Sequence, residues 1–260
     1  MTLPRLVGMV HLGPLPGAPR FGGSIQSVLD RAVVDATVLA EAGFDALIVE
    51  NYGDEPFFAD DVPKITVAAM TRAVAEVRDA VPIPVGVNVL RNDAMAALAV
   101  AAATGAAFIR VNVLAGAMVT DQGLVQGRAA QVARDRVALG GTAVWADVHV
   151  KHAVPLGPVT LEDASSDTYH RAGADVLIVS GPATGQPTST DDVARVRRAV
   201  PEAPVVVGSG VTTETVAQFL ATAHGVIAGT ALKRDGFTAG AVDPDRAAAL
   251  VAAARQPTSP

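Results

Sequence analysis

The chain has no cysteine among its 260 residues. Disulfide bonds, a thiol nucleophile and cysteine-bound metals are therefore excluded. It also lacks any apolar run approaching the ~20 residues that span a bilayer. Met1–Arg5 show neither the charged start nor the apolar core of a signal peptide. From these absences we expect a cytoplasmic protein without a transmembrane segment, and peripheral attachment to a membrane stays compatible with them.

The chain also has no excess of positively charged residues. The 20 Lys and Arg residues are outnumbered by 26 Asp and Glu residues, which gives a formal net charge of −6. A nucleic-acid-binding surface normally carries a basic patch or stripe, so we expect no nucleic-acid partner. The acidic balance does not oppose a small anionic ligand, because a local site can be positive on an acidic protein.

Short apolar runs alternate with helical runs along the whole chain. Half of the residues are hydrophobic, and the length is close to the ~250 residues of a typical (β/α)8 domain. We expect eight strands, at Leu6–Leu12, Ala46–Asn51, Pro84–Leu90, Phe108–Leu114, Ala143–Val150, Asp175–Ser180, Pro204–Val207 and Gly225–Ala228. Helices are expected at Ile25–Ala42, Ile65–Ala80, Ala94–Thr104, Leu124–Leu139, Leu161–Ala172, Asp191–Ala199, Thr213–Ala223 and Pro244–Ala254.

This alternation predicts the fold class. Parallel neighbouring strands need crossover connections, so the pattern indicates an α/β protein. We expect residues 1–260 to form one domain, a single parallel eight-stranded (β/α)8 TIM barrel. Gly43, Gly105 and Gly173 follow helical runs and are expected to end them. The competing arrangement is an open doubly wound sheet, whose dinucleotide-binding form is disfavoured because no G-x-G-x-x-G follows the first strand.

The expected turns from strand to helix are long and unusual. They include the Pro- and Gly-rich stretch 13–23 and the segments 52–58, 115–123 and 181–190. In TIM barrels this end of the strands holds the active site, so the long loops predict a functional face. The alternative is that they only cover the mouth of the barrel.

Two of these turns suggest a phosphate site. The seventh strand is followed by Gly208, Ser209 and Gly210, and the eighth by Gly229 and Thr230. Glycine lets the backbone approach a ligand closely, and a helix that begins there presents N–H groups to an anion. Two such turns in succession resemble the phosphate grip after strands 7 and 8 of a TIM barrel. The alternative is that both turns need glycine only for their geometry.

Polar residues gather near the carboxyl ends of the expected strands. Because side chains alternate along a strand, Arg110 and Asn112 share one face. A buried charge needs a partner, and Glu50 and Asp147 are the carboxylates expected to balance Arg110. We predict catalytic roles for Asp147, Glu50 and Lys151. The predicted substrate-binding residues are His11, Asn88, Arg110, Asn112 and His152.

Each of these residues has a structural alternative. His11 can be a hydrogen-bonded core residue, and Arg110 a structural ion-pair partner. Lys151 can bind an anionic oxygen, whereas a Schiff-base role requires a strongly lowered pKa. His11, Glu50, Asp147 and His152 are conceivable metal ligands, but no H-E-x-x-H or comparable motif supports them. We therefore expect neither a metal nor a cofactor.

The chain resembles the BtpA family nearly from end to end. The blocks that carry the resemblance are GMVHLGPLPGAPRFGG (8–23), LIVENYGDEPF (47–57), VGVNVLRND (85–93), FIRVNVLAGAMVTDQGLVQG (108–127), WADVHVKHAVPL (145–156), GPATG (181–185), and the segments VGSGVTTETV and IAGTALKRDG near the C-terminus. Two departures from the usual pattern, Thr-Thr-Glu-Thr at 212–215 and Ala-His-Gly at 223–225, flank the phosphate turns and leave their glycines intact.

The resemblance implies a barrel of the ribulose-phosphate-binding type and two classes of function. One is an enzyme acting on a phosphorylated sugar or nucleoside-like substrate, as a nucleosidase or a sugar-phosphate isomerase or lyase. The other is a non-catalytic photosystem I biogenesis factor, which implies peripheral association with a membrane. Phosphoribosylanthranilate isomerase activity is disfavoured because that enzyme usually uses a Cys and Asp pair, and this chain has no cysteine. Many barrels assemble, so a homo-oligomer is also expected.

Overall fold

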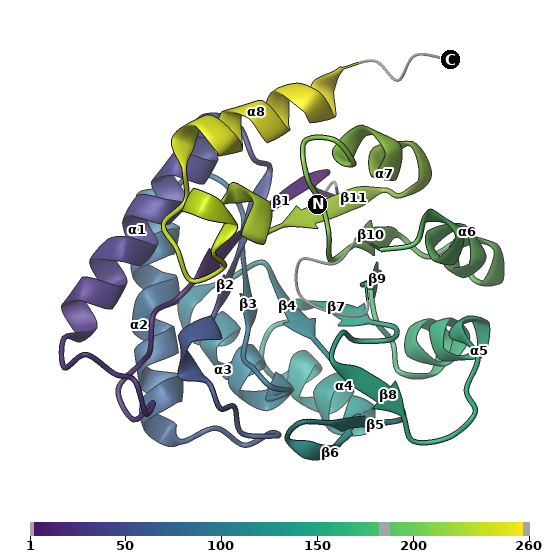
Figure 1. Ribbon diagram of the computed structural model, residues 1–260. Helices are drawn as coiled ribbons and strands as arrows, with labels where there is room; N and C mark the ends of the chain where they lie inside the picture. The colour runs from purple at the N-terminus through teal and green to yellow at the C-terminus, as the bar shows by residue number, and fades with distance from the viewer. Residues whose placement is uncertain (1–2, 182–187, 257–260) are drawn as a thin grey trace.

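Eight parallel strands form a closed barrel in the computed structural model, which describes residues 3–181 and 188–256. The order around the barrel is β1-β11-β10-β9-β7-β4-β3-β2, as Figure 1 shows. The closed sheet confirms the predicted TIM barrel and excludes the open doubly wound arrangement. The barrel strands are β1 (Leu6–His11), β2 (Ala46–Glu50), β3 (Val85–Asn88), β4 (Phe108–Val111), β7 (Ala143–Asp147), β9 (Val176–Val179), β10 (Val205–Val207) and β11 (Gly225–Ala228).

Helices surround the barrel and connect its strands. The predicted limits of α1 and α3 are confirmed, and both helices end at glycines with left-handed φ values, 99° at Gly43 and 69° at Gly105. After α5 the chain continues in a π-helical turn, Asp167–Arg171. The helices are α1 (Ile25–Ala42), α2 (Lys64–Ala80), α3 (Ala94–Thr104), α4 (Ala129–Ala138), α5 (Leu161–Ser166), α6 (Thr190–Ala199), α7 (Val216–Thr222) and α8 (Pro244–Arg255).

The predicted helix Leu124–Leu139 is wrong in its first part. The chain there forms β6 (Gly123–Gln126), which pairs with β5 (Ala117–Thr120) in an antiparallel hairpin. Gly123 has a φ of 91°, which lets the chain turn tightly between the two strands. A third strand, β8 (Ala153–Pro155), completes a small sheet in the order β6-β5-β8. This sheet lies beside the carboxyl end of the barrel and is an insertion into the simple alternation of strand and helix.

The lower part of the barrel interior is filled with apolar side chains. The inward cluster contains Val7, Met9, Ala46, Ile48, Phe108, Trp145, Val176, Ile178, Val206 and Ile227. The rings of Phe108 and Trp145 stack with their centroids 4.1 Å apart. Gly86 on β3 leaves room for this stack, because a Cβ at Gly86 would lie 2.4 Å from the Phe108 ring. The interior is therefore packed below, and polar residues occupy its carboxyl end.

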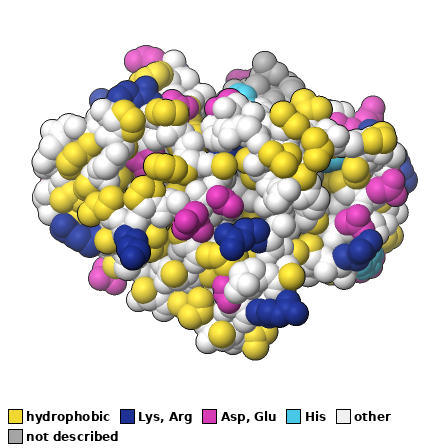
Figure 2. All heavy atoms as spheres, turned by 90° about the horizontal axis from the view of Figure 1, so that it is seen from below, with side chains coloured by type: hydrophobic (Ala, Val, Ile, Leu, Met, Phe, Trp, Pro, Cys, Tyr) yellow, Lys and Arg dark blue, Asp and Glu magenta, His cyan; other side chains and the backbone are white. Residues whose placement is uncertain are grey.

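The surface seen from below in Figure 2 carries hydrophobic, acidic and basic side chains mixed together. No single large area of one charge dominates this face. Among the described residues, no helix has both the length and the apolar composition needed to cross a bilayer.

Candidate functional site

A row of polar residues crosses four neighbouring strands at their carboxyl ends. His11 on β1 is in register with Glu50 on β2, which is in register with Asn88 on β3. Asn88 is in turn in register with Arg110 on β4. Residues in register on parallel strands point to the same face of the sheet, so all four side chains are on the inward face. The row lies directly above the apolar cluster of the barrel interior.

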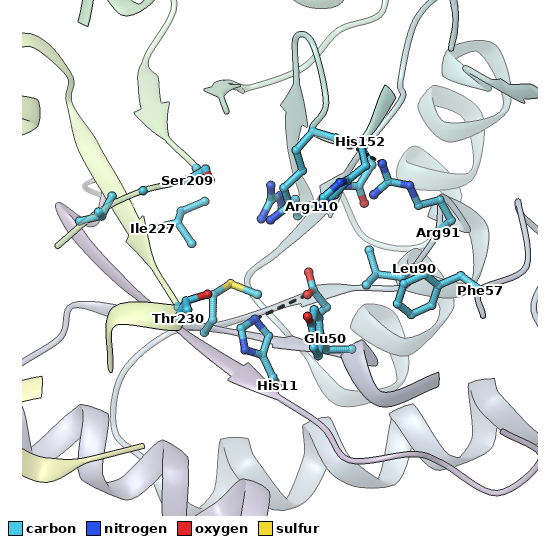
Figure 3. Close-up of a pocket in the computed structure, with 18 of the residues that line it drawn as sticks. His11, Glu50, Phe57, Leu90, Arg91, Arg110, His152, Ser209, Ile227 and Thr230 are labelled. Carbon is cyan, nitrogen blue, oxygen red and sulfur yellow. Dashed lines mark hydrogen bonds and ion pairs between the residues drawn. The ribbon is translucent and has the colours of Figure 1, made fainter. Parts of the chain in front are cut away.

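A cavity of about 530 Å³ lies above this row, within the size range of small-molecule sites. Figure 3 shows Glu50 and Arg110 in its centre, with Ser209 and Thr230 on one side and Arg91 and His152 on the other. The predicted residues that line it are His11, Glu50, Arg110, Asn112, Lys151, His152, Gly208, Ser209, Gly210, Gly229 and Thr230. The structure thus brings together eleven of the thirteen predicted site residues.

Asp147 lies behind Arg110 and does not line the cavity. Its carboxylate accepts hydrogen bonds from Nε and Nη2 of Arg110, both at 2.9 Å. Ser180 Oγ donates to the same carboxylate at 2.6 Å, and Asn112 Nδ2 at 3.5 Å. Burial lowers the pKa of Arg110, but the Asp147 carboxylate more than offsets this effect and the pKa is raised overall. Asp147 is thereby placed to orient a permanently charged Arg110, and a direct catalytic role for Asp147 stays a prediction.

Asn88 is the second predicted residue outside the cavity lining. Its Nδ2 donates to the Arg110 carbonyl and to Asn112 Oδ1, both at 3.0 Å. The Asn88 side chain therefore fixes the backbone of β4 and the amide of Asn112. Its own Oδ1 is buried and has no hydrogen-bond partner among the described residues.

Glu50 and Lys151 face the cavity with oppositely shifted pKa values. Burial raises the pKa of Glu50, and the nearby cations, Lys151 first among them, only partly offset this effect. Burial also lowers the pKa of Lys151, and the charge of Arg110 lowers it further. Within the described residues, the Lys151 ammonium has neither a hydrogen-bond nor an ion-pair partner. Both shifts move the groups toward the pH range in which they can exchange protons.

His11 connects Glu50 with the loop after β11. Its Nδ1 lies 3.3 Å from the Thr238 carbonyl, and a carbonyl can only accept, so Nδ1 carries the proton. Burial, followed by the charge of Lys233, holds the pKa of His11 well below its usual value. The imidazole is therefore neutral, and its Nε2 is an acceptor 3.7 Å from Glu50 Oε1.

The two predicted phosphate turns line the same cavity, as a shared anion site requires. Packing and backbone conformation also require glycine in these turns. The alternative that the turns need glycine only for their geometry therefore stays open. A Cβ at Gly208 would lie 2.5 Å from Ile178, and one at Gly229 would lie 3.1 Å from His11. Gly210 has a left-handed φ of 69°. The Gly208 N–H donates to Val179 within the barrel, so this glycine offers close approach and not its N–H.

Several cavity residues were missed by sequence reasoning. Arg91 is only 6% exposed and follows β3 by three residues, a position that would have pointed to it. Asp121 and Gln122 reach the cavity from the tip of the β5–β6 hairpin, which the sequence pattern did not predict. The other missed lining residues are Met9, Tyr52, Glu55, Phe57, Leu90, Val211, Thr212, Ile227, Ala231 and Gly236.

Two further expectations concern metals and the sixth turn. In residues 3–181 and 188–256, no three His, Asp or Glu side chains are placed to hold a metal ion. The suggested ligand set His11, Glu50, Asp147 and His152 thus gains no support. Most of the predicted sixth turn, 181–190, and of the GPATG block lies outside the described residues.

Comparison with known sequences identifies relatives that match nearly the whole chain. The BtpA family matches residues 3–256. The photosystem I biogenesis protein BtpA of Synechocystis is 46% identical over 249 residues, which cover 95% of this chain and 87% of the relative. An uncharacterized protein of Thermococcus kodakarensis is 47% identical, with 96% of this chain and 95% of the relative covered. The sgc region protein SgcQ of Escherichia coli is 32% identical, with coverages of 94% and 92%.

Solved structures of other TIM barrels resemble the chain in fold. Tryptophan synthase of Mycobacterium tuberculosis matches with a TM-score of 0.63 at 20% identity, covering 97% of this chain and 93% of that one. Phosphoribosyl anthranilate isomerase of Thermococcus kodakaraensis matches with a TM-score of 0.59 at 18% identity, with coverages of 98% and 100%. Thiamine phosphate pyrophosphorylase of Pyrococcus furiosus matches at 0.58 and 12%, with coverages of 96% and 95%. At these identities the likeness concerns the fold alone.

Proposed function

We propose that this chain, which belongs to the BtpA family, is an enzyme acting on a phosphorylated sugar or nucleoside-like substrate. The observation that carries the proposal is the pairing of Glu50 and Lys151 in one cavity with oppositely shifted pKa values. Groups whose environments displace their pKa values in this way are typical acid and base partners. The cavity also lies at the end of the barrel where TIM-barrel enzymes have their active sites.

The substrate phosphate lies in this proposal against the turns Gly208–Gly210 and Gly229–Thr230. Gly208 and Gly229 permit the close approach, and Ser209 and Thr230 border the same side of the cavity. The reactive end then extends toward Glu50, Arg110 and Lys151. Arg110, held in place by Asp147, stabilises negative charge that develops on a substrate oxygen.

The same residues suit two reaction types. In hydrolysis of an N-glycosidic bond, water adds to the anomeric carbon while the C–N bond breaks. The Glu50 carboxylate takes a proton from the water, and the Lys151 ammonium gives one to the departing nitrogen. In an isomerisation, Glu50 removes a proton from one carbon and returns it to the neighbouring carbon, while Lys151 and Arg110 stabilise the intermediate oxyanion.

A ligand panel tests the proposal. Wild-type protein and the variants Glu50→Gln and Lys151→Met are mixed with sugar phosphates and nucleoside phosphates, and thermal shift and product formation are recorded. We expect at least one ligand to raise the melting temperature of wild type, and Glu50→Gln to bind it without turnover. Lys64→Met, an exposed lysine outside the cavity, is the control. The proposal fails if no ligand stabilises wild type at concentrations far above a plausible Kd.

The name of the Synechocystis relative favours a second candidate, a non-catalytic factor in photosystem I biogenesis. Such a factor has no need for a proton-transferring Glu50. Complementation separates the two candidates, because this chain can be expressed in a Synechocystis strain that lacks the relative. If wild type complements, an assembly factor keeps that effect when Glu50 is replaced by Gln, whereas an enzyme loses it while staying folded.

A further inference from the structure

Two cations and a histidine line the cavity on the side away from the two glycine turns. Burial, followed by the charges of Arg91 and Lys151, lowers the pKa of the histidine, His152. We define this cluster by Arg91, which follows β3, and by Lys151 and His152, which follow β7. Arg91 Nη2 donates to the Lys151 carbonyl at 2.6 Å, which ties the two turns together. Arg91 is only 6% exposed, so its charge is directed into the protein and the cavity rather than into bulk solvent.

The strand order places Arg91 across the barrel from the first predicted phosphate turn. In the closed ring β3, which Arg91 follows, lies opposite β10, whereas β7, which Lys151 and His152 follow, is separated from β10 by β9. Figure 3 shows the same arrangement, with Ser209 and Thr230 at one side and Arg91 and His152 at the other. A ligand anchored at the turns therefore extends toward the cluster as it crosses the cavity.

Neither cation of the cluster, Arg91 or Lys151, forms an ion pair with another described residue. Arg110 and Asp147 satisfy each other, and Glu55 pairs with Arg20. The carboxylates of Asp147, Asp121 and Glu50 attract Arg91, but none of them forms an ion pair with Arg91 or Lys151. The lowered pKa of Lys151, caused by burial and then by Arg110, has the direction expected of crowded cations. A bound oxyanion would supply the missing counter-charge and hydrogen-bond acceptors.

We infer that Arg91, Lys151 and His152 form a second anion subsite, so that the substrate carries an oxyanion at each end. The glycine turns hold one phosphate, and the cluster holds a second phosphate or a carboxylate. This inference rests on the proposed function for the first phosphate, and it narrows the substrate class to doubly anionic sugar or nucleoside derivatives.

Calorimetric titration with linear ligands tests the inference. The probes are alkyl monophosphates of three to six carbons, the α,ω-bisphosphates of the same lengths, and monophosphates that end in a carboxylate. For wild type we expect one length at which a doubly anionic ligand binds about tenfold tighter than the matching monophosphate, the gain of one charge-assisted contact. The bisphosphate and the carboxylate series then distinguish which second anion the cluster prefers.

Variants test whether the cluster causes the tighter binding of the doubly anionic ligand. Arg91→Gln is expected to remove the tighter binding of the doubly anionic ligand while the affinity for monophosphates stays at the wild-type value, and Lys151→Met is expected to remove the tighter binding as well. Lys64→Met and Arg134→Gln replace exposed cations outside the cavity and are expected to keep it. Circular dichroism checks folding, and Lys151→Met carries the test if Arg91→Gln fails to fold, because the Lys151 ammonium makes no contact that folding requires.

The titrations distinguish failure of the second subsite from failure of the proposed function. If monophosphates bind but no doubly anionic ligand binds tighter at any length, or if the gain survives in both cavity variants, the second subsite is overturned and the proposed function stands. If no phosphorylated ligand binds wild type, the proposed function fails and the second subsite fails with it.

Discussion

At the residue scale, the Arg110–Asp147 pair shows how burial makes two charges depend on each other. Both residues are only 2% exposed, and they share two hydrogen bonds in parallel geometry. Taking either charge out of water is unfavourable by itself, and the partner repays that penalty only while it is present. Removal of one member is therefore far more harmful than the modest worth of an exposed ion pair.

Asp147→Asn is expected to lower the free energy of unfolding by roughly 3–5 kcal/mol, because it leaves Arg110 buried without its counter-charge. Urea denaturation measures the loss. Glu76→Ala is the matched control, since it breaks the exposed Arg72–Glu76 pair, and it should change stability by less than about 1 kcal/mol. Equal losses in the two variants would show that Asp147 is not the required partner of Arg110.

Glu50 makes stability depend on pH. Its folded pKa is raised above the ordinary 4.5, mainly by burial. The folded state thus holds the proton more tightly than the unfolded chain, and this contribution to stability is fully present below the ordinary pKa. It is lost as the pH rises through the raised folded pKa, where the carboxylate must be buried in its charged form.

Glu50→Gln removes this penalty, so we expect the variant to be more stable than wild type near neutral pH. The difference should narrow as the pH falls below the ordinary pKa of 4.5, where wild-type Glu50 is protonated in both states. Unfolding free energies of both proteins across this pH range are the measurement. A difference that is constant over the range would contradict a titrating Glu50.

Single residues also show where sequence reasoning reaches its limit. The alternation of side chains placed Glu50, Arg110 and Lys151 at the same end of the barrel, and the structure gathers them around one cavity. The alternation does not show how far a side chain lies from the cavity, however. It therefore did not distinguish Arg110, which lines the cavity, from Asp147, which lies behind Arg110. That distinction depends on how far each strand extends and on the length of the side chain, which only the packed barrel fixes.

At the scale of elements, the fit between β3 and β4 depends on one missing side chain. Gly86 and Phe108 are in register, and the Phe108 ring occupies the space next to Gly86 while it stacks on Trp145. The glycine thus permits a large ring inside a narrow barrel. Its role is packing, because its φ is not in the left-handed region.

Gly86→Ala is expected to lower the free energy of unfolding by roughly 1–3 kcal/mol, since its methyl group meets the Phe108 ring at 2.4 Å. Thermal or urea unfolding measures this. Phe108→Leu in the same chain should restore part of the loss by making room. Gly157→Ala is the control, because a Cβ there meets nothing within 4 Å. If Phe108→Leu adds a further loss instead, the ring is not the obstacle.

The β6-β5-β8 sheet explains why one element was assigned wrongly. Leu124 and Val125 are apolar and precede a true helix, so the segment looked like the start of that helix. In the structure Val125 and Met118 face a small separate core with Val113 and Val150. The segment pairs with β5 in a hairpin, and β5 also pairs with β8, which lies after β7 in the sequence. The long-range pairing of β5 with β8, which completes the small sheet, leaves no periodic signal in a short window.

At the scale of the whole molecule, the sequence was sufficient for topology because each strand and helix is short, regular and separated by clear breaks. Closure of the ring was inferred from length and from the glycine turns after the last two strands. The sequence pattern does not show how the loop after β11 is held against α1. That contact joins residues from opposite ends of the chain.

An ion pair between Asp35 on α1 and Lys233 in the loop after β11 makes this contact. Lys233 Nζ lies 3.2 Å from Asp35 Oδ2, and the side chains of both residues are 0–1% exposed. Asp35 Oδ1 also accepts the Val242 N–H at 2.9 Å. The same loop borders the cavity through Thr230 and meets His11 through the Thr238 carbonyl. One buried carboxylate thus holds a loop that forms part of the site.

Asp35→Asn keeps an acceptor for Val242 but leaves Lys233 buried without a counter-charge. We expect it to lower the free energy of unfolding by roughly 3–5 kcal/mol, measured by urea denaturation. Arg31→Gln is the control, because Arg31 contacts the same carboxylate from the partly exposed side and should matter by less than about 1 kcal/mol. The double variant Asp35→Asn with Lys233→Met keeps the acceptor for Val242 and removes the unpaired charge, so it should recover much of the loss. If the double variant is no more stable than Asp35→Asn, the unpaired charge of Lys233 is not the cause of the loss.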